Sequence, residues 1–246
     1  MAPTVYLVSG ANRGIGLGLV TSLAARDNVV VFAGARNPAS ASDLKALETK
    51  YPGKVHTVKL TSADVADNTA AAEEIKKVAG KLDVVIANAG IAKFFGTILD
   101  TPLSEMRDHF EVNVVGPTVL FQTMWPLLKA SPKPEFAIIT TVAGSIAFGA
   151  ALPAGFMAYG SSKAAVNYLA MKLHSEHPEI VSVLIHPGPV ETDAGNYAKE
   201  ADPVVKTMAF ISVEESVTGI LKLVDEAKRE EEGPKMIGYD GTVFPW

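Results

Sequence analysis

A tyrosine and a lysine four residues apart are the first side chains whose types and spacing could do chemistry. Tyr159 and Lys163 stand in the run Tyr-Gly-Ser-Ser-Lys, within a segment of helical character. Side chains at this spacing share one face of a helix and lie side by side. A free phenol has a pKa of about 10, and a neighbouring ammonium lowers it towards neutrality. The pair predicts a general acid, although the same spacing also occurs by chance on helix surfaces.

A glycine-rich turn is the second candidate. The run Ser-Gly-Ala-Asn-Arg-Gly-Ile-Gly follows an apolar strand pattern and opens a helix. Glycines permit a tight turn and a close approach of phosphate, and the first turn of a helix offers free N–H donors. The turn therefore predicts phosphate binding, with a plain strand-to-helix connection as the alternative. The candidate contacts are Gly10, Asn12, Arg13, Gly14, Ile15 and Gly16.

Two arginines bear on which dinucleotide this turn would take. NAD enzymes tend to carry an acid at the end of the second strand, where it binds the ribose 2′-hydroxyl. This chain has Arg36 there and no acid. Together with Arg13 it could clamp a 2′-phosphate through charge-assisted bonds, which favours NADP over NAD. The alternative is that both arginines are solvated surface residues.

Strands and helices must alternate to position these residues. Apolar runs predict strands at 5–9, 29–33, 55–60, 84–87, 137–140 and 181–185, with a further strand near the C-terminus. Periodic segments predict helices after the glycine turn and at 44–51, 69–79, 103–130, 158–177 and 213–228. Alternation of this kind over one domain's length means a parallel sheet with helices on both faces.

Local signals refine the helix ends. Thr101 before Pro102 predicts a capping hydroxyl followed by a proline at the first helical position. Ser212, three residues before a glutamate, fits a capping box. Pro117 and Pro126 predict a kinked or shortened helix.

Five motifs in order identify a family resemblance. They are the glycine turn, the run Ala-Asn-Ala-Gly ending at Gly90, Asn113 in Glu-Val-Asn-Val, the Tyr159/Lys163 pair, and the run Pro-Gly-Pro-Val-Glu-Thr from Pro187. Over essentially its whole length the chain resembles the short-chain dehydrogenase/reductase family. The resemblance implies one α/β Rossmann-fold domain over 1–246 with a seven-stranded parallel sheet. Within the family the chain is similar to fungal norsolorinic-acid ketoreductases, which belong to secondary metabolism, and to small carbonyl reductases.

The resemblance also implies roles for single residues. Tyr159 would protonate a carbonyl oxygen, Lys163 would hold the nicotinamide ribose and lower the tyrosine pKa, and Asn113 would anchor a water linking the lysine to solvent. The cofactor would be NADP(H). Its adenosine ribose side would be lined by Asn88, Ala89 and Gly90, with Asn88 also bracing the sheet, and its nicotinamide and diphosphate by Pro187, Gly188, Val190 and Thr192.

The chain departs from the family pattern at two places. Where the family has a second serine after the fifth strand, this chain has Thr141, whose hydroxyl can make the same hydrogen bond. Ser145 is the alternative, although a loop hydroxyl bonded to its own backbone is the favoured reading of it. Where relatives have an acid against the adenine, this chain has Thr61, with Asp64 as the alternative or as a solvated turn residue.

The expected substrate follows from apolar loops. Segments 145–158 and 191–211 carry aromatic and aliphatic residues, and Phe94 and Phe95 follow the Ala-Asn-Ala-Gly run. With Phe156, Tyr197, Met208 and Phe210 they favour a bulky hydrophobic or aromatic ketone, polyketide-like, that is reduced to a secondary alcohol. The alternatives are an NADPH-binding sensor or scaffold without turnover, and a non-redox dehydratase or cyclase.

Composition narrows the remaining classes. The net charge of −5 and the absence of a basic stripe argue against nucleic acid, and the lack of cysteine excludes disulfides and thiolate sites. Five scattered histidines predict no metal site. No targeting or membrane-spanning pattern is seen, so we expect a cytoplasmic protein without a membrane partner. The family resemblance implies a homodimer or homotetramer as a possible assembly.

Overall fold

The computed structural model describes residues 2–246 and contains the expected sheet with one addition. The strand order is β3-β2-β1-β4-β5-β6-β7-β8, and the first seven strands pair in parallel. The extra strand β8 runs antiparallel to β7, because a tight turn at Gly238–Gly241 reverses the chain. The strands are β1 (Thr4–Val8), β2 (Val29–Ala35), β3 (Val55–Lys59), β4 (Val84–Ala87), β5 (Glu135–Ile139), β6 (Val181–His186), β7 (Met236–Gly238) and β8 (Val243–Phe244).

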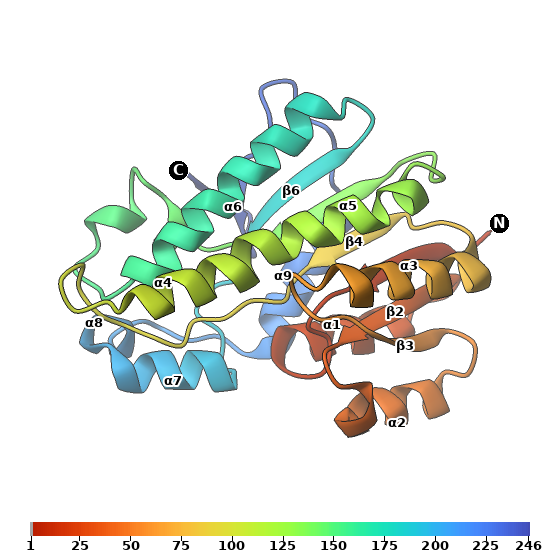
Figure 1. Cartoon of the computed structure of the whole chain (residues 1–246), viewed down its shortest axis with the longest axis horizontal. Helices are drawn as coiled ribbons and strands as arrows, with labels where there is room; N and C mark the ends of the chain where they lie inside the picture. The colour runs from red at the N-terminus through yellow and green to blue at the C-terminus, as the bar shows by residue number, and fades with distance from the viewer. Residues whose placement is uncertain (1) are drawn as a thin grey trace.

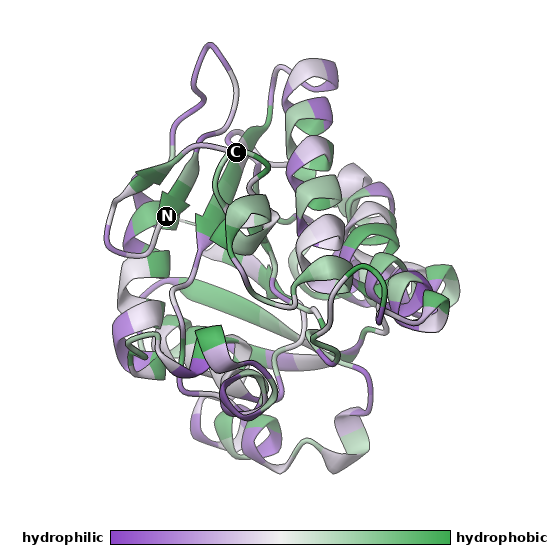
Figure 2. Cartoon of the chain, turned by 90° about the vertical axis from the view of Figure 1, so that its left-hand side faces the viewer, coloured by the Kyte–Doolittle hydropathy of each residue, from purple (hydrophilic) through white to green (hydrophobic). Residues whose placement is uncertain are grey.

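Helices cover both faces of this sheet, as predicted (Figure 1). One face packs against α1, α2 and α9, and the other against α3, α5 and α6. Figure 2 shows the hydrophobic strands enclosed between the helices. The α-helices are α1 (Gly14–Ala24), α2 (Ser42–Lys50), α3 (Val65–Ala79), α4 (Leu103–Phe110), α5 (Gly116–Leu128), α6 (Met157–Glu176), α7 (Asp193–Ala201), α8 (Pro203–Lys206) and α9 (Val213–Asp225).

The long helix expected at 103–130 is divided into two. A π-helical segment, η2 (Glu111–Val115), separates α4 from α5. In it the Gly116 N–H donates to the Glu111 carbonyl, one residue further back than in an α-helix. Pro117 follows in the first turn of α5, and Pro126 lies two residues before that helix ends. The α-helical pattern is thus interrupted just before Pro117 and ends two residues after Pro126, short of the expected residue 130.

One predicted cap is wrong and one is confirmed. Thr101 does not cap α4: Pro102 takes the cap position, and the Thr101 hydroxyl instead donates to the Thr97 carbonyl at 2.6 Å. That hydroxyl is already hydrogen-bonded within the preceding turn, which begins at Thr97. Ser212 caps α9, accepting from the Glu215 N–H at 3.0 Å.

Both outer edges of the sheet are short or covered. At one edge lies β8, with only two residues. At the other, an outward N–H of β3, on Thr57, donates to the Glu48 carboxylate of α2 at 2.6 Å. No helix within residues 2–246 has the length and apolar character that crossing a membrane requires.

Candidate active site

The predicted residues converge at the carboxyl ends of the strands, around a cavity of about 260 Å³. In open parallel sheets this is the edge where ligands bind. Its walls come from the loops after β4, β5 and β6, from the first turn of α1, from α6, and from a segment that we call the lid (residues 191–211). Ten predicted site residues line it: Ile15, Asn88, Gly90, Thr141, Tyr159, Lys163, Pro187, Gly188, Val190 and Thr192.

Tyr159 and Lys163 stand on the first two turns of α6, facing the cavity. Burial raises the pKa of Tyr159 to about 12, and only its hydrogen bond with the Thr141 hydroxyl acts in the opposite direction. Burial lowers the pKa of Lys163 to about 8. The expected lowering of the tyrosine pKa by the lysine is therefore absent in this structure. The Lys163 Nζ instead donates to the Ile139 carbonyl at 2.7 Å.

The sequence leaves two hydroxyls, those of Thr141 and Ser145, as candidates for the partner of the tyrosine, and the structure distinguishes between them. Thr141 lines the cavity with Tyr159, is 8% exposed, and acts to lower the pKa of the phenol. Its hydroxyl also accepts from the Ala143 N–H at 3.2 Å. Ser145 is engaged elsewhere: its hydroxyl donates to the Pro245 carbonyl at 2.6 Å and accepts from the Phe148 N–H at 2.9 Å. The predicted backbone-bonding role of Ser145 therefore holds, and Thr141 is the hydroxyl within reach of the phenol.

Asn113 lies in the π-helical segment η2, fully buried behind the cavity. Its amide oxygen accepts from the Ile91 N–H at 2.8 Å, and its amide nitrogen donates to the Ile91 carbonyl and to the Ser162 hydroxyl. A Cβ built on Gly90 would lie 3.2 Å from Asn113 Oδ1 and 3.6 Å from Lys163 Nζ. Asn113 Oδ1 and Lys163 Nζ therefore both lie close to Gly90.

The glycine turn has the geometry that phosphate binding needs. Gly10 and Gly14 have positive φ angles of +64° and +53°, and a Cβ on Gly16 would overlap the Gly10 carbonyl oxygen. The helix that follows, α1, begins without a side-chain cap, since Arg13 at the cap position makes no such bond. Its first N–H groups are therefore free of a side-chain acceptor. Asn12 is exposed on the same turn.

The neighbouring strand ends hold this turn in place. The Asn88 amide donates to the Ser9 carbonyl at 2.9 Å and to the Gly10 carbonyl at 3.2 Å. In return the Ser9 hydroxyl accepts from the N–H groups of Asn88 and Ala89, both at 3.0 Å. Asn88 thus braces β1 against β4, as the resemblance implied. Ser9 was missed by the sequence analysis, although its place as the first residue after β1 is a usable signal.

The two arginines are exposed at the open end of this turn. Arg36 directly follows β2, and Arg13 forms a weak ion pair with Asp193, 3.3 Å away, with side chains 71% and 80% exposed. An exposed pair of this kind contributes little to stability, so a bound anion could displace the aspartate. Asp193 is the first residue of α7, which brings the lid next to the arginine.

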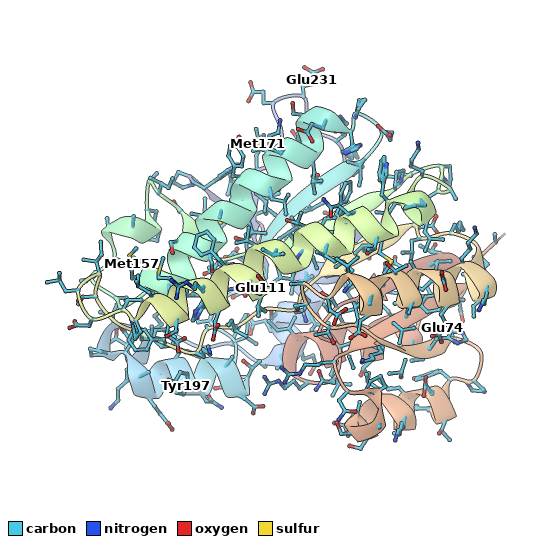
Figure 3. The ribbon with its side chains drawn as sticks, in the orientation of Figure 1. Glu74, Glu111, Met157, Met171, Tyr197 and Glu231 are labelled. Carbon is cyan, nitrogen blue, oxygen red and sulfur yellow. The ribbon has the colours of Figure 1, made fainter. Side chains whose placement is uncertain are left out.

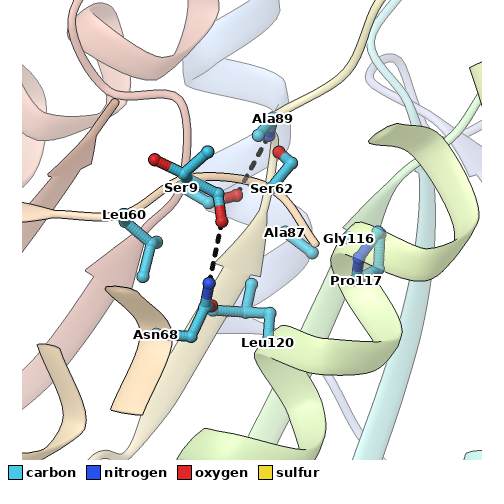
Figure 4. Close-up of a pocket in the computed structure, with 10 residues that line it drawn as sticks. Ser9, Leu60, Ser62, Asn68, Ala87, Ala89, Gly116, Pro117 and Leu120 are labelled. Atoms are coloured by element: carbon cyan, nitrogen blue, oxygen red, sulfur yellow. Dashed lines mark hydrogen bonds between the residues drawn. The ribbon is translucent and has the colours of Figure 1, made fainter. Parts of the chain in front are cut away.

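A second, smaller pocket opens beside the glycine turn (Figure 4). Thr61 and Ala89 line it, together with Ser9, Ser62 and Pro117. Asp64 does not line it. Its carboxylate accepts from the Asp67 N–H at 2.9 Å and so caps α3. Of the two residues left open for the adenine contact, Thr61 is the one that reaches a pocket.

The apolar and aromatic residues expected around a substrate divide into two groups. Phe95, Phe156, Met208 and Phe210 line the cavity, whereas Phe94 does not and packs instead against Gly96. Tyr197, labelled on α7 in Figure 3, lies outside the cavity: its hydroxyl donates to the Lys93 carbonyl at 3.0 Å and its ring packs on Phe95.

Comparison with known proteins identifies the family. The family model described as short chain dehydrogenase matches residues 4–203. The chain is 38% identical over 252 residues to the norsolorinic acid ketoreductase of Dothistroma septosporum, covering 99% of this chain and 92% of that protein. It is 35% identical over 251 residues to an uncharacterized oxidoreductase of Schizosaccharomyces pombe, covering 98% of both.

Solved structures agree with this assignment. The NADPH-bound carbonyl reductase from chicken fatty liver superposes with a TM-score of 0.88 at 32% identity, covering all of both chains. The carbonyl reductase Sniffer of Drosophila melanogaster gives a TM-score of 0.86 at 26% identity, again over all of both chains. The chain therefore belongs to the short-chain dehydrogenase family of oxidoreductases, as its five motifs indicated.

Proposed function

We propose that the chain is an NADPH-dependent ketoreductase that reduces a bulky hydrophobic or aromatic ketone, of polyketide type, to a secondary alcohol. The observation that carries this is that Tyr159, Thr141 and Lys163 line one largely apolar cavity. A ketone oxygen placed there meets two hydroxyl donors, while the rest of the molecule contacts hydrocarbon. The ketoreductase and carbonyl reductases named above support the same reaction.

The residues around the glycine turn fit NADPH. Left-handed glycines and an uncapped helix start suit a diphosphate, and two exposed arginines suit a 2′-phosphate. NADPH, when bound, supplies the hydride. We assign its binding to Gly10, Asn12, Arg13, Gly14, Ile15, Gly16, Arg36, Thr61, Asn88, Ala89, Gly90, Tyr159, Lys163, Pro187, Gly188, Val190 and Thr192.

In this proposal the chain positions the ketone and delivers a proton. Tyr159 donates its phenolic proton to the carbonyl oxygen, and the high pKa of the phenol keeps that proton in place at neutral pH. Thr141 holds the same oxygen by a second hydrogen bond. Lys163 as an ammonium would hold the nicotinamide ribose, and Asn113 would anchor a water that links the lysine to solvent and returns a proton.

The substrate pocket is assigned to segments of the same domain. Leu152 and Phe156 from segment 145–158 line the cavity together with the lid residues Met208 and Phe210. Both segments therefore contribute apolar wall, which favours a ketone wide enough to contact each of them.

The proposed acid is tested by replacing Tyr159 with phenylalanine. Turnover of an aryl ketone should fall by about 10²- to 10⁴-fold, the usual contribution of a positioned proton donor. NADPH affinity, followed by cofactor fluorescence, should stay within about twofold because the ring remains. Tyr168→Phe, on an exposed face of the same helix, is the matched control and should change neither value.

The same assay separates the proposal from its alternatives. Reduction adds two hydrogens to the ketone, which product mass detects, whereas a dehydratase or cyclase gives a different mass. A protein that binds NADPH tightly but converts none of a panel of aryl ketones would contradict the ketoreductase assignment and favour a sensor.

A further inference from the structure

One buried carboxylate connects the lid to the opposite wall of the cavity. Asp202 lies between α7 and α8 and is 6% exposed. One of its oxygens accepts from the N–H groups of Val204 and Val205, at 2.9 and 3.1 Å, and so caps α8. The other accepts from the Gly155 N–H, 47 residues away, at 2.7 Å. A carboxylate that receives three N–H groups forms charge-assisted hydrogen bonds, the stronger kind.

Gly155 is also hydrogen-bonded to a third segment, the loop after β4. Its carbonyl accepts from the Gly96 N–H at 2.9 Å, and a Cβ at Gly155 would stand 2.5 Å from that nitrogen. The two backbones are therefore in close contact, and Gly96 also pairs with Phe156 as an isolated parallel bridge. Asp202 thus holds Gly155, the residue at which the lid, segment 145–158 and the loop after β4 all meet.

The aromatic wall of the cavity begins at this peptide. Phe156 directly follows Gly155. Its ring packs on Phe95, with the ring centroids 5.9 Å apart, and on the candidate acid Tyr159, with the centroids 6.4 Å apart. No residue of α7 is buried, whereas Val205 of α8 is 4% exposed. Tyr197 joins α7 to the loop after β4, because its hydroxyl donates to the Lys93 carbonyl and its ring packs on Phe95. The hydrogen bond from Gly155 therefore bears on the width of the cavity.

We propose that Asp202 is a positioning residue that determines substrate size, because it holds the lid against Phe156 and closes the cavity around a bulky ketone. This inference rests on the proposed function for its substrate, but not for the hydrogen bond itself. With the bond broken, the lid separates from segment 145–158. A ketone that touches both walls then loses contacts, whereas a small ketone held only at Tyr159 and Thr141 does not.

Two substitutions break this bond and keep the helix cap. In Asp202→Asn the amide oxygen still caps α8, but the amide NH₂ opposes the Gly155 N–H, donor against donor. In Asp202→Ser the hydroxyl caps the helix and is too short to reach Gly155. Glu200→Gln, at an exposed position of α7, removes a lid charge without touching the bond and is the matched control.

The test combines steady-state kinetics with hydrogen exchange. For a polycyclic aryl ketone, KM should rise about tenfold in both Asp202 variants, as expected for one charge-assisted hydrogen bond. For a small aliphatic ketone KM and kcat should stay within about twofold, and Glu200→Gln should match the unaltered protein on both. Amide exchange in 153–157 and 193–206 should accelerate in the Asp202 variants only, with and without NADPH.

Two outcomes would overturn the inference. Equal losses for the large and the small ketone would mean that Asp202 supports the fold and not the cavity width. Unchanged exchange in both variants would mean that the bond does not hold the lid. If the unaltered protein reduces neither ketone, the proposed function fails while the exchange measurement still decides whether Asp202 anchors the lid.

Discussion

At the scale of single residues, the site depends on the partly buried Tyr159 and the buried Lys163, whose pKa values shift in opposite directions. Burial disfavours the charged form of each, which raises the pKa of Tyr159 to about 12 and lowers that of Lys163 to about 8. Near pH 7 the phenol is therefore neutral and the lysine is mostly an ammonium. Tyr159 therefore has a proton to donate, while a pKa nearer to neutral pH would make it a stronger acid.

The lysine predicts the pH dependence of turnover. Above about pH 8 Lys163 loses its proton, and kcat for ketone reduction should fall by up to tenfold per pH unit as the ammonium fraction falls. Below that value kcat should be level. A profile of kcat from pH 6 to 10 at saturating NADPH measures this. A level profile up to pH 10 would show that the charge of Lys163 is not needed.

The hydroxyl pair gives a second prediction. Thr141→Val should lower kcat by about 100-fold, the usual cost of removing one donor from a developing oxyanion, and should cost only the one structural hydrogen bond from the Ala143 N–H. Ser145→Ala should leave kcat nearly unchanged and lower the melting temperature more, because it removes two structural hydrogen bonds and Ser145 does not line the cavity. Kinetics and thermal unfolding on both variants check the assignment. The reversed pattern would make Ser145 the catalytic hydroxyl.

At the scale of elements, the end of β2 carries the cofactor preference. Arg36 directly follows that strand in an exposed position, where an acid would instead suit NADH. NADPH should bind much more tightly than NADH, and Arg36→Ala should narrow the difference by about tenfold or more, as loss of a charge-assisted pair implies. Fluorescence titration with both cofactors measures the ratio. Equal affinities in the unaltered protein would contradict the arginine argument.

Several elements could be predicted from sequence because their signals are local. Apolar runs located the strands, and the glycine turn located the start of α1. Other features depend on distant partners. The π-helical segment η2 is accompanied by Asn113 bonds to Ile91 and Ser162, and the Asp202 bond needs Gly155, 47 residues away. The lid helices α7 and α8 were expected only as an irregular segment, since α7 buries no residue and shows no core-facing pattern.

At the scale of the whole molecule, the candidate active-site cavity and a buried titratable carboxyl lie at opposite ends of the sheet strands. The cavity lies at the carboxyl ends of the strands, whereas Glu135 is the first residue of β5, at the amino end. It is 3% exposed, and within residues 2–246 its Oε1 has no hydrogen-bond partner. Burial raises the pKa of this carboxyl to about 8, with Lys133 acting against the shift and Asp225 adding to it.

This carboxyl predicts how stability depends on pH. From about pH 4.5 to 8 the folded chain keeps a proton on Glu135 that the unfolded chain releases. The free energy of unfolding should therefore fall as pH rises, by up to about 1.4 kcal/mol per unit from this group. Glu135→Gln should remove that slope, measured by urea unfolding at pH 5 to 8. Glu232→Gln, in an exposed loop, should keep it, and identical slopes in all three proteins would refute the assignment.

The short strand β8 and the Glu48 bond to Thr57 have a consequence for the protein in concentrated solution. An exposed sheet edge with a row of unpaired N–H and C=O groups is a template on which another chain can add a strand. Here one edge offers only two residues, and the other has an outward N–H already occupied by a carboxylate. Edge-to-edge aggregation of folded molecules through the sheet is thereby opposed at both of its edges.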